Sequence, residues 1–225
     1  MLDYSASIFE DFDHGFNLNW QGISDDHKDN ESWQIENNML WRRNITYTLK
    51  GVVSYVYLTD FMFNEFSLEV DVKIRDVGTD ARVGVVFGLL DNNFYRFRIY
   101  LSSQTADLWC RGWFSPTHSP SEWCRFVSTR LEKKIYLQKW YRLRVVVNNE
   151  RWQFYIDGNK VIDLATDTYF QFLDICDING KSIGSCSMYL NSCYPRNAYV
   201  GLYCVEADVS FDNVRICNLT SSVPK

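Results

Sequence analysis

The chain is poor in proline, glycine and histidine, and none of its apolar runs is long. Its 225 residues include 4 Pro, 11 Gly and 3 His, too few for a proline- or glycine-rich linker or a collagen-like segment. The longest apolar stretch, Val83 to Leu90, is about half as long as the roughly 18 residues of a membrane helix, and Gly84 and Gly88 interrupt it. The sequence therefore predicts no membrane span.

An excess of positive charge is also absent. The chain has 23 Lys and Arg against 28 Asp and Glu, which gives a formal net charge of −5. Affinity for nucleic acid depends on clustered Lys and Arg that neutralise phosphates. The composition therefore argues against a nucleic acid as partner.

Aromatic residues, in contrast, are abundant, and apolar residues alternate with polar ones. The chain has 15 Phe, 14 Tyr and 8 Trp, a composition that favours strands. Residues 66–74, 94–101 and 140–147 alternate with the period of two that is typical of a half-buried strand. Turn-forming residues such as Asp157-Gly158-Asn159 separate the strands. This pattern predicts an all-β antiparallel sandwich that forms a single domain over residues 1–225.

Two stretches, residues 102–134 and 165–197, break the pattern and are too long for hairpin turns, so we expect insertions there. They contain most of the 7 cysteines. The candidates for disulfides are Cys110, Cys124, Cys176, Cys186, Cys193 and Cys204. Disulfides in such loops indicate an extracellular or secreted protein, although no signal peptide is visible at the start of the chain. The alternative is that several of these cysteines are buried thiols, because Cys packs as a small apolar residue.

Several short motifs follow one another in a characteristic order. They are Phe9-Glu-Asp-Phe-Asp-His-Gly15, Trp33-Gln-Ile35, Phe66-Ser-Leu-Glu-Val-Asp-Val72, Asp91-Asn-Asn-Phe-Tyr95, Trp140-Tyr-Arg-Leu-Arg-Val145, Tyr155-Ile-Asp-Gly158 and Val209-Ser-Phe-Asp-Asn-Val-Arg-Ile216. In this order they resemble the concanavalin A-like jelly-roll superfamily, and most nearly its laminin G-like and carbohydrate-associated modules. The resemblance implies a two-sheet jelly roll. It implies no single function, because this fold hosts lectins, glycosidases and adhesion modules.

The resemblance also implies that the two ends of the chain pair with each other. We expect the segment from Phe9 to Asp13 beside the segment from Val209 to Ile216, with Phe9, Phe12, Val209 and Phe211 in the core. The apolar positions change from odd to even numbers at Asp212-Asn213, which predicts a β-bulge there.

A catalytic strand of the superfamily's glycosidases, Glu-x-Asp-x-x-Glu, is only partly present. The matching residues are Glu69-Val-Asp71-Val-Lys73-Ile74, in which the last acid is missing. A retaining glycosidase needs two carboxyl groups about 5 Å apart, one as nucleophile and one as general acid. The sequence therefore predicts that the protein is not an enzyme.

Binding is the favoured hypothesis. The polar positions of the central strands include Arg96, Arg98, Tyr100, Arg142, Arg144 and Tyr155. If the strands are neighbours, these side chains form one face whose guanidinium and phenol groups suit sugar hydroxyls and carboxylates. Trp113 is the candidate for a stacking platform in the first insertion. The alternative is a solvated face of cross-strand ion pairs.

The resemblance further implies one structural calcium ion between an N-terminal acidic segment and the last strand. The matching carboxylates are Asp11, Asp13 and Asp212, while carbonyls and waters would supply the remaining ligands. The predicted function is a non-catalytic, lectin-like extracellular module that binds a glycan or glycoprotein. The alternative is a structural or adhesion domain that contacts other protein subunits. A third, less favoured hypothesis is a glycoside hydrolase whose catalytic residues lie in the two insertions.

Overall fold

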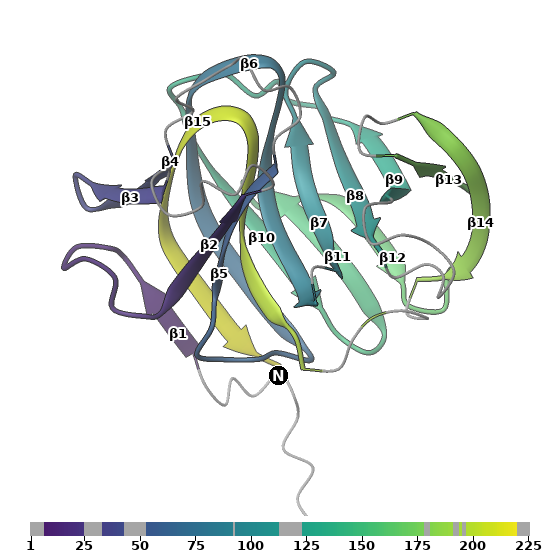
Figure 1. The fold of residues 1–225 in the computed structure, drawn as a ribbon, viewed down its shortest axis with the longest axis horizontal. Helices are drawn as coiled ribbons and strands as arrows, with labels where there is room; N and C mark the ends of the chain where they lie inside the picture. The colour runs from purple at the N-terminus through teal and green to yellow at the C-terminus, as the bar shows by residue number, and fades with distance from the viewer. Residues whose placement is uncertain are drawn as a thin grey trace, which may run out of the picture.

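The computed structural model describes residues 7–24, 33–42, 53–91, 93–112, 123–177, 181–190, 194 and 197–219. All regular structure in these residues is β-strand (Figure 1). In chain order the strands are β1 (Ser7–Glu10), β2 (Trp20–Ser24), β3 (Trp33–Glu36), β4 (Met39–Arg42), β5 (Val53–Leu58), β6 (Phe66–Leu90), β7 (Asn93–Tyr100), β8 (Thr105–Arg111), β9 (Trp123–Arg130), β10 (Trp140–Val147), β11 (Arg151–Ile156), β12 (Asn159–Ala165), β13 (Tyr169–Cys176), β14 (Ser182–Tyr189) and β15 (Tyr199–Asn218).

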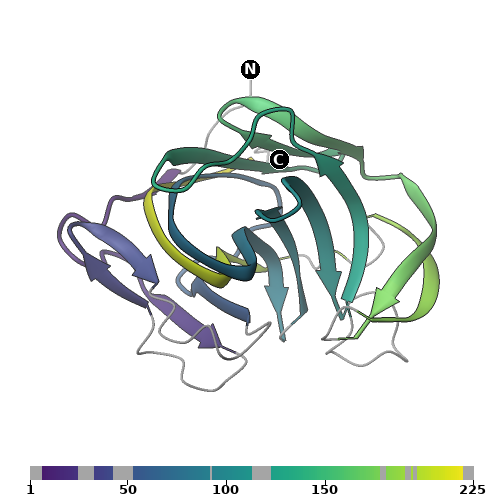
Figure 2. The same cartoon turned by 90° about the horizontal axis from the view of Figure 1, so that it is seen from above.

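The strands form one continuous antiparallel sheet that folds into two layers (Figure 2). The long strands β6 and β15 pair with each other along most of their length and run through both layers. Sheet I contains β12, β11, β10, the first part of β6, the last part of β15 and β1, with β4 and β3 at its edge. Sheet II contains β2, β5, the first part of β15, the last part of β6, β7, β8, β9, β13 and β14. This is the predicted all-β, jelly-roll-like architecture.

The core lies between the two layers, where the alternating residues of each strand meet. In β6, the side chains of Leu68, Val70, Val72 and Ile74 are at most 1% exposed. They belong to the same apolar cluster as inward-facing residues of sheet II such as Phe97. The predicted hairpin between β11 and β12 is also present, with positive φ angles of 48° at Asp157 and 76° at Gly158. The period of two therefore predicted these strands correctly.

The two ends of the chain pair as predicted. Residues of β1 lie opposite the last part of β15, from Ser7 with Cys217 to Glu10 with Val214. The register of β15 shifts after Asp212, and Asn213 has a φ of 52°, so the predicted bulge is confirmed.

One core assignment at this end is wrong. Phe12, Val209 and Phe211 are fully buried, but the Phe9 side chain is 48% exposed. Its ring packs under the Arg215 guanidinium instead, 5.6 Å from ring centroid to Cζ.

The two predicted insertions contain four regular strands. Residues 102–134 include β8 and β9, and residues 165–197 include β13 and β14, all paired within sheet II. In β8, Ala106, Leu108 and Cys110 face the core while Asp107 and Trp109 face outward. Because all five of these side chains are buried, the polar–apolar contrast that signals a strand is weak.

The predicted disulfides are not found in the described residues. Cys110, Cys124, Cys176, Cys186 and Cys204 are thiols, and Cys193 lies outside the described residues. The nearest pair, Cys124 Sγ and Cys186 Sγ, is 3.9 Å apart, well beyond the ~2.05 Å of a disulfide bond. Burial raises the pKa of Cys204 to about 11. These residues pack as small apolar side chains, and the extracellular location remains a prediction without them.

No helix in the described part of the chain is long and apolar enough to cross a membrane.

Candidate functional site

The structure divides the predicted binding face between two opposite surfaces. Arg142, Arg144 and Tyr155 project from the outer side of sheet I, whereas Arg96 and Arg98 project from the outer side of sheet II. The core separates the two sets. The sequence assigned the parity of each strand correctly, but β6 passes from one layer to the other, so polar positions on its two neighbours β10 and β7 face opposite ways.

The outer side of sheet I is a face of cross-strand ion pairs. Arg142 donates two hydrogen bonds to Asp71, from Nε to Oδ1 at 2.7 Å and from Nη2 to Oδ2 at 2.8 Å. Arg144 Nε lies 3.4 Å from Glu69 Oε1, and the Arg144 guanidinium lies over the Tyr155 ring. Both carboxylates of the partial glycosidase motif are therefore paired with arginines. For this half of the predicted residues, the solvated ion-pair alternative describes the structure.

The outer side of sheet II carries a second set, which we call the arginine–aromatic face. It consists of Arg82 of β6, Arg96 and Arg98 of β7, Trp109 of β8, Trp123 of β9 and Tyr203 of β15. Each strand places alternate residues on this side, because the intervening ones face the core.

Arg96 is the centre of this face. Its guanidinium Cζ lies 3.7 Å from the Trp123 ring centroid, 5.4 Å from that of Trp109 and 5.2 Å from that of Tyr203. Its Nη1 donates a hydrogen bond to the Tyr203 hydroxyl at 2.7 Å. Only 4% of the residue is exposed, and this burial lowers the pKa of Arg96 well below its usual value.

Arg98 is held by a buried carboxylate. Its Nη2 lies 3.2 Å from Asp107 Oδ2, and the hydroxyl of Ser128 donates to Asp107 Oδ1 at 2.6 Å. Arg98 also stacks on Trp109, 4.7 Å from Cζ to the ring centroid. Burial lowers the pKa of Arg98, although Tyr203 and Asp107 oppose the shift. The ion pair and the ring fix the orientation of the guanidinium.

Four side-chain N–H donors on the arginine–aromatic face have no acceptor among the residues that the structure describes. They are Arg82 Nε, Arg96 Nε, Arg98 Nη1 and Trp109 Nε1, all buried. Burying a polar group without a hydrogen bond costs about 1–3 kcal/mol in proteins. Such a group in a native fold calls for an explanation, and a role in binding a ligand that accepts its hydrogen bond is one. The arrangement is suited to bind a molecule that offers hydrogen-bond acceptors next to an apolar surface.

The sequence predicted this face only in part. It selected Arg96, Arg98 and Tyr100 but expected them to be solvated, whereas Arg96 and Arg98 are buried by aromatic rings. Tyr100 is half-buried and lies beneath the guanidinium of Arg82 at 5.1 Å. Trp113 lies outside the described residues. Trp109, Trp123 and Tyr203 were missed as site residues; the signal that could have found them was their position in phase with Arg96 on neighbouring strands.

The predicted calcium ligands lie near one another but already have other roles. Asp11 Oδ1 accepts the backbone N–H of Asp13 at 3.1 Å, and Asp212 Oδ1 accepts that of Asn213 at 2.7 Å. Within the described residues, no three His, Cys, Asp or Glu side chains are arranged to hold a metal ion. These carboxylates alone supply too few of the six to eight oxygen ligands that calcium takes, and calcium remains a prediction.

The same carboxylates lead to a pH-dependent prediction. Burial raises the pKa of Asp212 above its usual 3.8, and the carboxylates of Asp71, Asp13 and Asp11 raise it further. The folded state therefore binds this proton more tightly than the unfolded state. The stabilisation is complete below the unfolded pKa and is lost as pH rises through the folded pKa. Asp212→Asn should thus increase the free energy of unfolding near neutral pH but have little effect at pH values below about 3.9, in urea titrations with EDTA.

Asp163 provides a control, because its pKa is shifted in the opposite direction from that of Asp212. Hydrogen bonds from Arg151 and Lys160 lower its pKa to about 2. Its stabilisation is present above the unfolded pKa and is lost as pH falls through the folded pKa. Asp163→Asn should destabilise the protein at neutral pH, and the two variants changing stability in the same direction would contradict the assignment.

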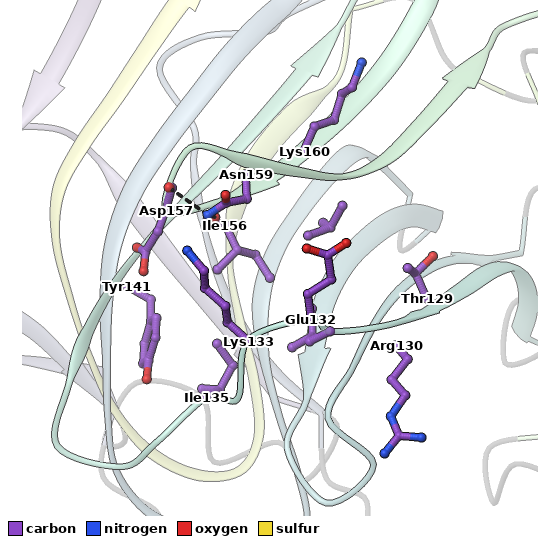
Figure 3. Close-up of a pocket in the computed structure, with 12 residues that line it drawn as sticks. Thr129, Arg130, Glu132, Lys133, Ile135, Tyr141, Ile156, Asp157, Asn159 and Lys160 are labelled. Carbon is purple, nitrogen blue, oxygen red and sulfur yellow. Dashed lines mark hydrogen bonds between the residues drawn. The ribbon is translucent and has the colours of Figure 1, made fainter.

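A separate cavity of about 130 Å³ lies between the segment after β9 and the β11–β12 hairpin (Figure 3). Its apolar lining includes Ile135, Tyr141 and Ile156, and Lys160 and Arg130 extend away from each other at its rim. The Tyr141 hydroxyl already accepts the backbone N–H of Tyr136 at 2.8 Å. None of the described residues with buried, unpartnered polar atoms lines this cavity. It therefore lacks the unmet hydrogen-bonding capacity of the arginine–aromatic face.

Comparison with known proteins relates the chain to one family by sequence and to several solved structures by fold. The family model of the 3-keto-alpha-glucoside-1,2-lyase-like domain matches residues 7–217. A sequence search of curated proteins found no match. The carbohydrate-binding module CBM66 from Bacillus subtilis superposes with a TM-score of 0.57 at 18% identity, over 88% of this chain and 96% of that one. The laminarinase catalytic domain from Thermotoga maritima superposes with a TM-score of 0.60 at 11% identity, over 94% and 96%.

The two structural similarities show the fold alone, since both identities are low. One of these proteins is a binding module and the other a catalytic domain, so the fold does not decide between the two roles. The family match does bear on it. Because the matched family is lyase-like, it contradicts the prediction that the protein is not an enzyme. The prediction failed because it relied on motifs of hydrolases, chiefly the glycosidase strand, and a lyase does not need that pair of carboxylates.

Proposed function

Because the chain belongs to the 3-keto-alpha-glucoside-1,2-lyase-like domain family, we propose that it is a carbohydrate-active domain that binds its sugar on the arginine–aromatic face. The observation that carries the proposal is the set of four buried N–H donors without acceptors, beside the rings of Trp109, Trp123 and Tyr203. Sugars offer both features that such a face requires. Their oxygens accept hydrogen bonds, and their C–H faces pack against aromatic rings.

Trp109 provides the sharpest test of this proposal. Its Nε1–H has no acceptor, so Trp109→Phe removes a donor that contributes nothing to the fold. The smaller ring of Phe leaves space in a buried cluster, so we expect some loss of stability, together with a loss of about threefold to tenfold in sugar affinity, the equivalent of one hydrogen bond. Isothermal titration against the best ligand from a glycan panel measures the second quantity, and thermal unfolding measures the first.

Arg144→Gln on the opposite face is the matched control. Its ion pair with Glu69 is partly exposed, so we expect no change in sugar affinity and little in stability. Loss of binding in Arg144→Gln with full binding in Trp109→Phe would place the sugar on sheet I and contradict the proposal.

The family match favours a second, catalytic candidate: elimination of the glycosidic group from a 3-keto glucoside. In this reaction a base removes the proton at C2, which the neighbouring ketone acidifies. The electron pair forms a C1–C2 double bond as the C1–oxygen bond breaks, and the departing alcohol takes up a proton. Cationic N–H donors suit the negative charge that develops on the ketone oxygen, and Arg96 and Arg98 are donors of this kind.

A 3-keto glucoside incubated with the protein provides the test. The catalytic candidate predicts release of the alcohol together with a conjugated enone, both detectable by nuclear magnetic resonance. Arg96→Lys should slow the reaction, and Arg144→Gln should not. Release of the alcohol without an enone would indicate hydrolysis instead.

A further inference from the structure

We propose that the sugar bound on the arginine–aromatic face is anionic, and that its carboxylate or sulfate group binds Arg96. This inference rests on the proposed function and specifies the substrate class for the same site. The observation behind it is a buried cation that forms no ion pair with the residues that the structure describes. Arg82 is paired with Asp80, and Arg98 with Asp107, whereas Arg96 donates to the neutral hydroxyl of Tyr203, its one hydrogen-bond partner among the described residues.

Such a cation is costly to bury. A charge removed from water is tolerated when an opposite charge and hydrogen bonds compensate it. For Arg96 the guanidinium groups of Arg98 and Arg82 lower the pKa in addition to the effect of burial, and Tyr203 and Asp107 oppose this shift only in part. An oxyanion next to Arg96 would offset the burial and both repulsions at once. A neutral sugar would offset none of the charge.

The hydrogen-bonding capacity of the face leads to the same class of ligand. Its unpartnered groups, Arg82 Nε, Arg96 Nε, Arg98 Nη1 and Trp109 Nε1, are all donors. A sugar hydroxyl both donates and accepts hydrogen bonds and therefore needs an acceptor in the site as well as a donor. A carboxylate or sulfate oxygen only accepts. The buried acceptor beside Arg98, Asp107, is already engaged through both oxygens, by Arg98 and Ser128. The set therefore matches an oxyanion better than a hydroxyl.

An exposed guanidinium extends the positive charge towards solvent. Arg125 is exposed, and its Cζ lies 5.6 Å from the centroid of the Trp109 ring. Trp109 thus lies in reach of Arg96, Arg98 and Arg125 on one face of a chain whose net charge is −5. A local excess of positive charge on an acidic protein steers anions to that position.

Three oligosaccharides matched in length test the proposal: one neutral, one with uronic acids and one with sulfate esters. In isothermal titration at low salt, the better of the two charged ligands should bind about tenfold or more tightly than the neutral one, as charge-assisted hydrogen bonds to a guanidinium would give. The preference should shrink at high salt. The uronate and sulfate arms identify which oxyanion the site takes, and preference for either supports the proposal.

Two substitutions locate the anion. Arg96→Gln should abolish the preference for the charged ligand while retaining weak binding of the neutral one. Because Arg96 is buried and the variant could unfold, Arg125→Gln is the second test: this side chain is exposed, and its loss should reduce the preference several-fold. Arg144→Gln on sheet I is the control and should leave the preference intact.

Equal or tighter binding of the neutral oligosaccharide would overturn the anion proposal and leave the proposed function standing. A charge preference that disappears in Arg144→Gln but survives in Arg125→Gln would overturn it by placing the anion on the other face. If none of the three ligands nor any other glycan binds, the proposed function fails as well.

Discussion

Deleting residues 1–15 should unfold the domain rather than shorten a loose tail. The deletion removes β1, which pairs with the last part of β15. It also removes the Glu10 carboxylate, which accepts the backbone N–H groups of Phe12, Asn17 and Leu18 at 3.0–3.2 Å. The fully buried ring of Phe12 alone is expected to contribute about 3–5 kcal/mol, out of a total stability of about 5–15 kcal/mol for a typical domain. Circular dichroism and a urea titration measure the outcome.

Two point substitutions separate the buried ring from the segment as a whole. Phe12 is 0% exposed and packs against the rings of Phe16 and Trp20, each with a centroid distance of 6.2 Å. Phe12→Ala should therefore lower the free energy of unfolding by about 3–5 kcal/mol. Phe9 is half-exposed, so Phe9→Ala should lower it by at most about 1 kcal/mol. A deletion variant with the melting temperature of the full chain would refute the role of this segment.

Much of the fold could be predicted from sequence because its signals are local. The alternation in residues 66–74 identifies a strand with one face in the core, and that strand is buried as expected. The change of parity at Asp212-Asn213 identifies a bulge because an inserted residue reverses the side on which all later residues project. Both features depend only on the sequence of one strand.

Strand β8 was missed because its outward face is buried as well as its inward face. In β8, the outward residues Asp107 and Trp109 are covered by groups from neighbouring strands and are as buried as the core residues between them. Polar and apolar residues alternate only where one face of a strand is exposed to solvent. A strand of this kind that contains cysteine and tryptophan then has a composition similar to that of a disulfide-bonded loop.

The candidate site was half-predicted for a related reason. The alternation within β7 shows that Arg96 and Arg98 face away from the core, and they do. Their burial is set by Trp109, Trp123 and Tyr203, which come from three other strands. Strand order in the sheet is long-range information, so the sequence of β7 alone could not distinguish a solvated arginine from one enclosed by rings.

Because of this enclosure, removal of the Arg98 side chain should cost more stability than removal of a solvated arginine. Arg98→Ala should lower the free energy of unfolding by about 3–5 kcal/mol, because it leaves the buried carboxylate of Asp107 without its counter-charge. The side chains of both partners are only 4% exposed. Arg144→Ala, which breaks a partly exposed pair with Glu69, should cost at most about 1 kcal/mol. Urea titration of the two variants measures the contrast.

A double substitution determines whether the charge or the loss of packing causes the effect. If the unpaired Asp107 carboxylate dominates, adding Asp107→Leu to Arg98→Met should recover most of the lost stability, since buried ion pairs replaced by apolar residues are often neutral or stabilising. If instead the stacking of Arg98 on Trp109 dominates, the double variant should remain as unstable as Arg98→Ala. Recovery of stability together with loss of sugar affinity would indicate that this ion pair is retained for binding, because the fold would then be no less stable without it. A cost below about 1 kcal/mol for Arg98→Ala would mean that the guanidinium reaches water, which contradicts the enclosed arginine–aromatic face.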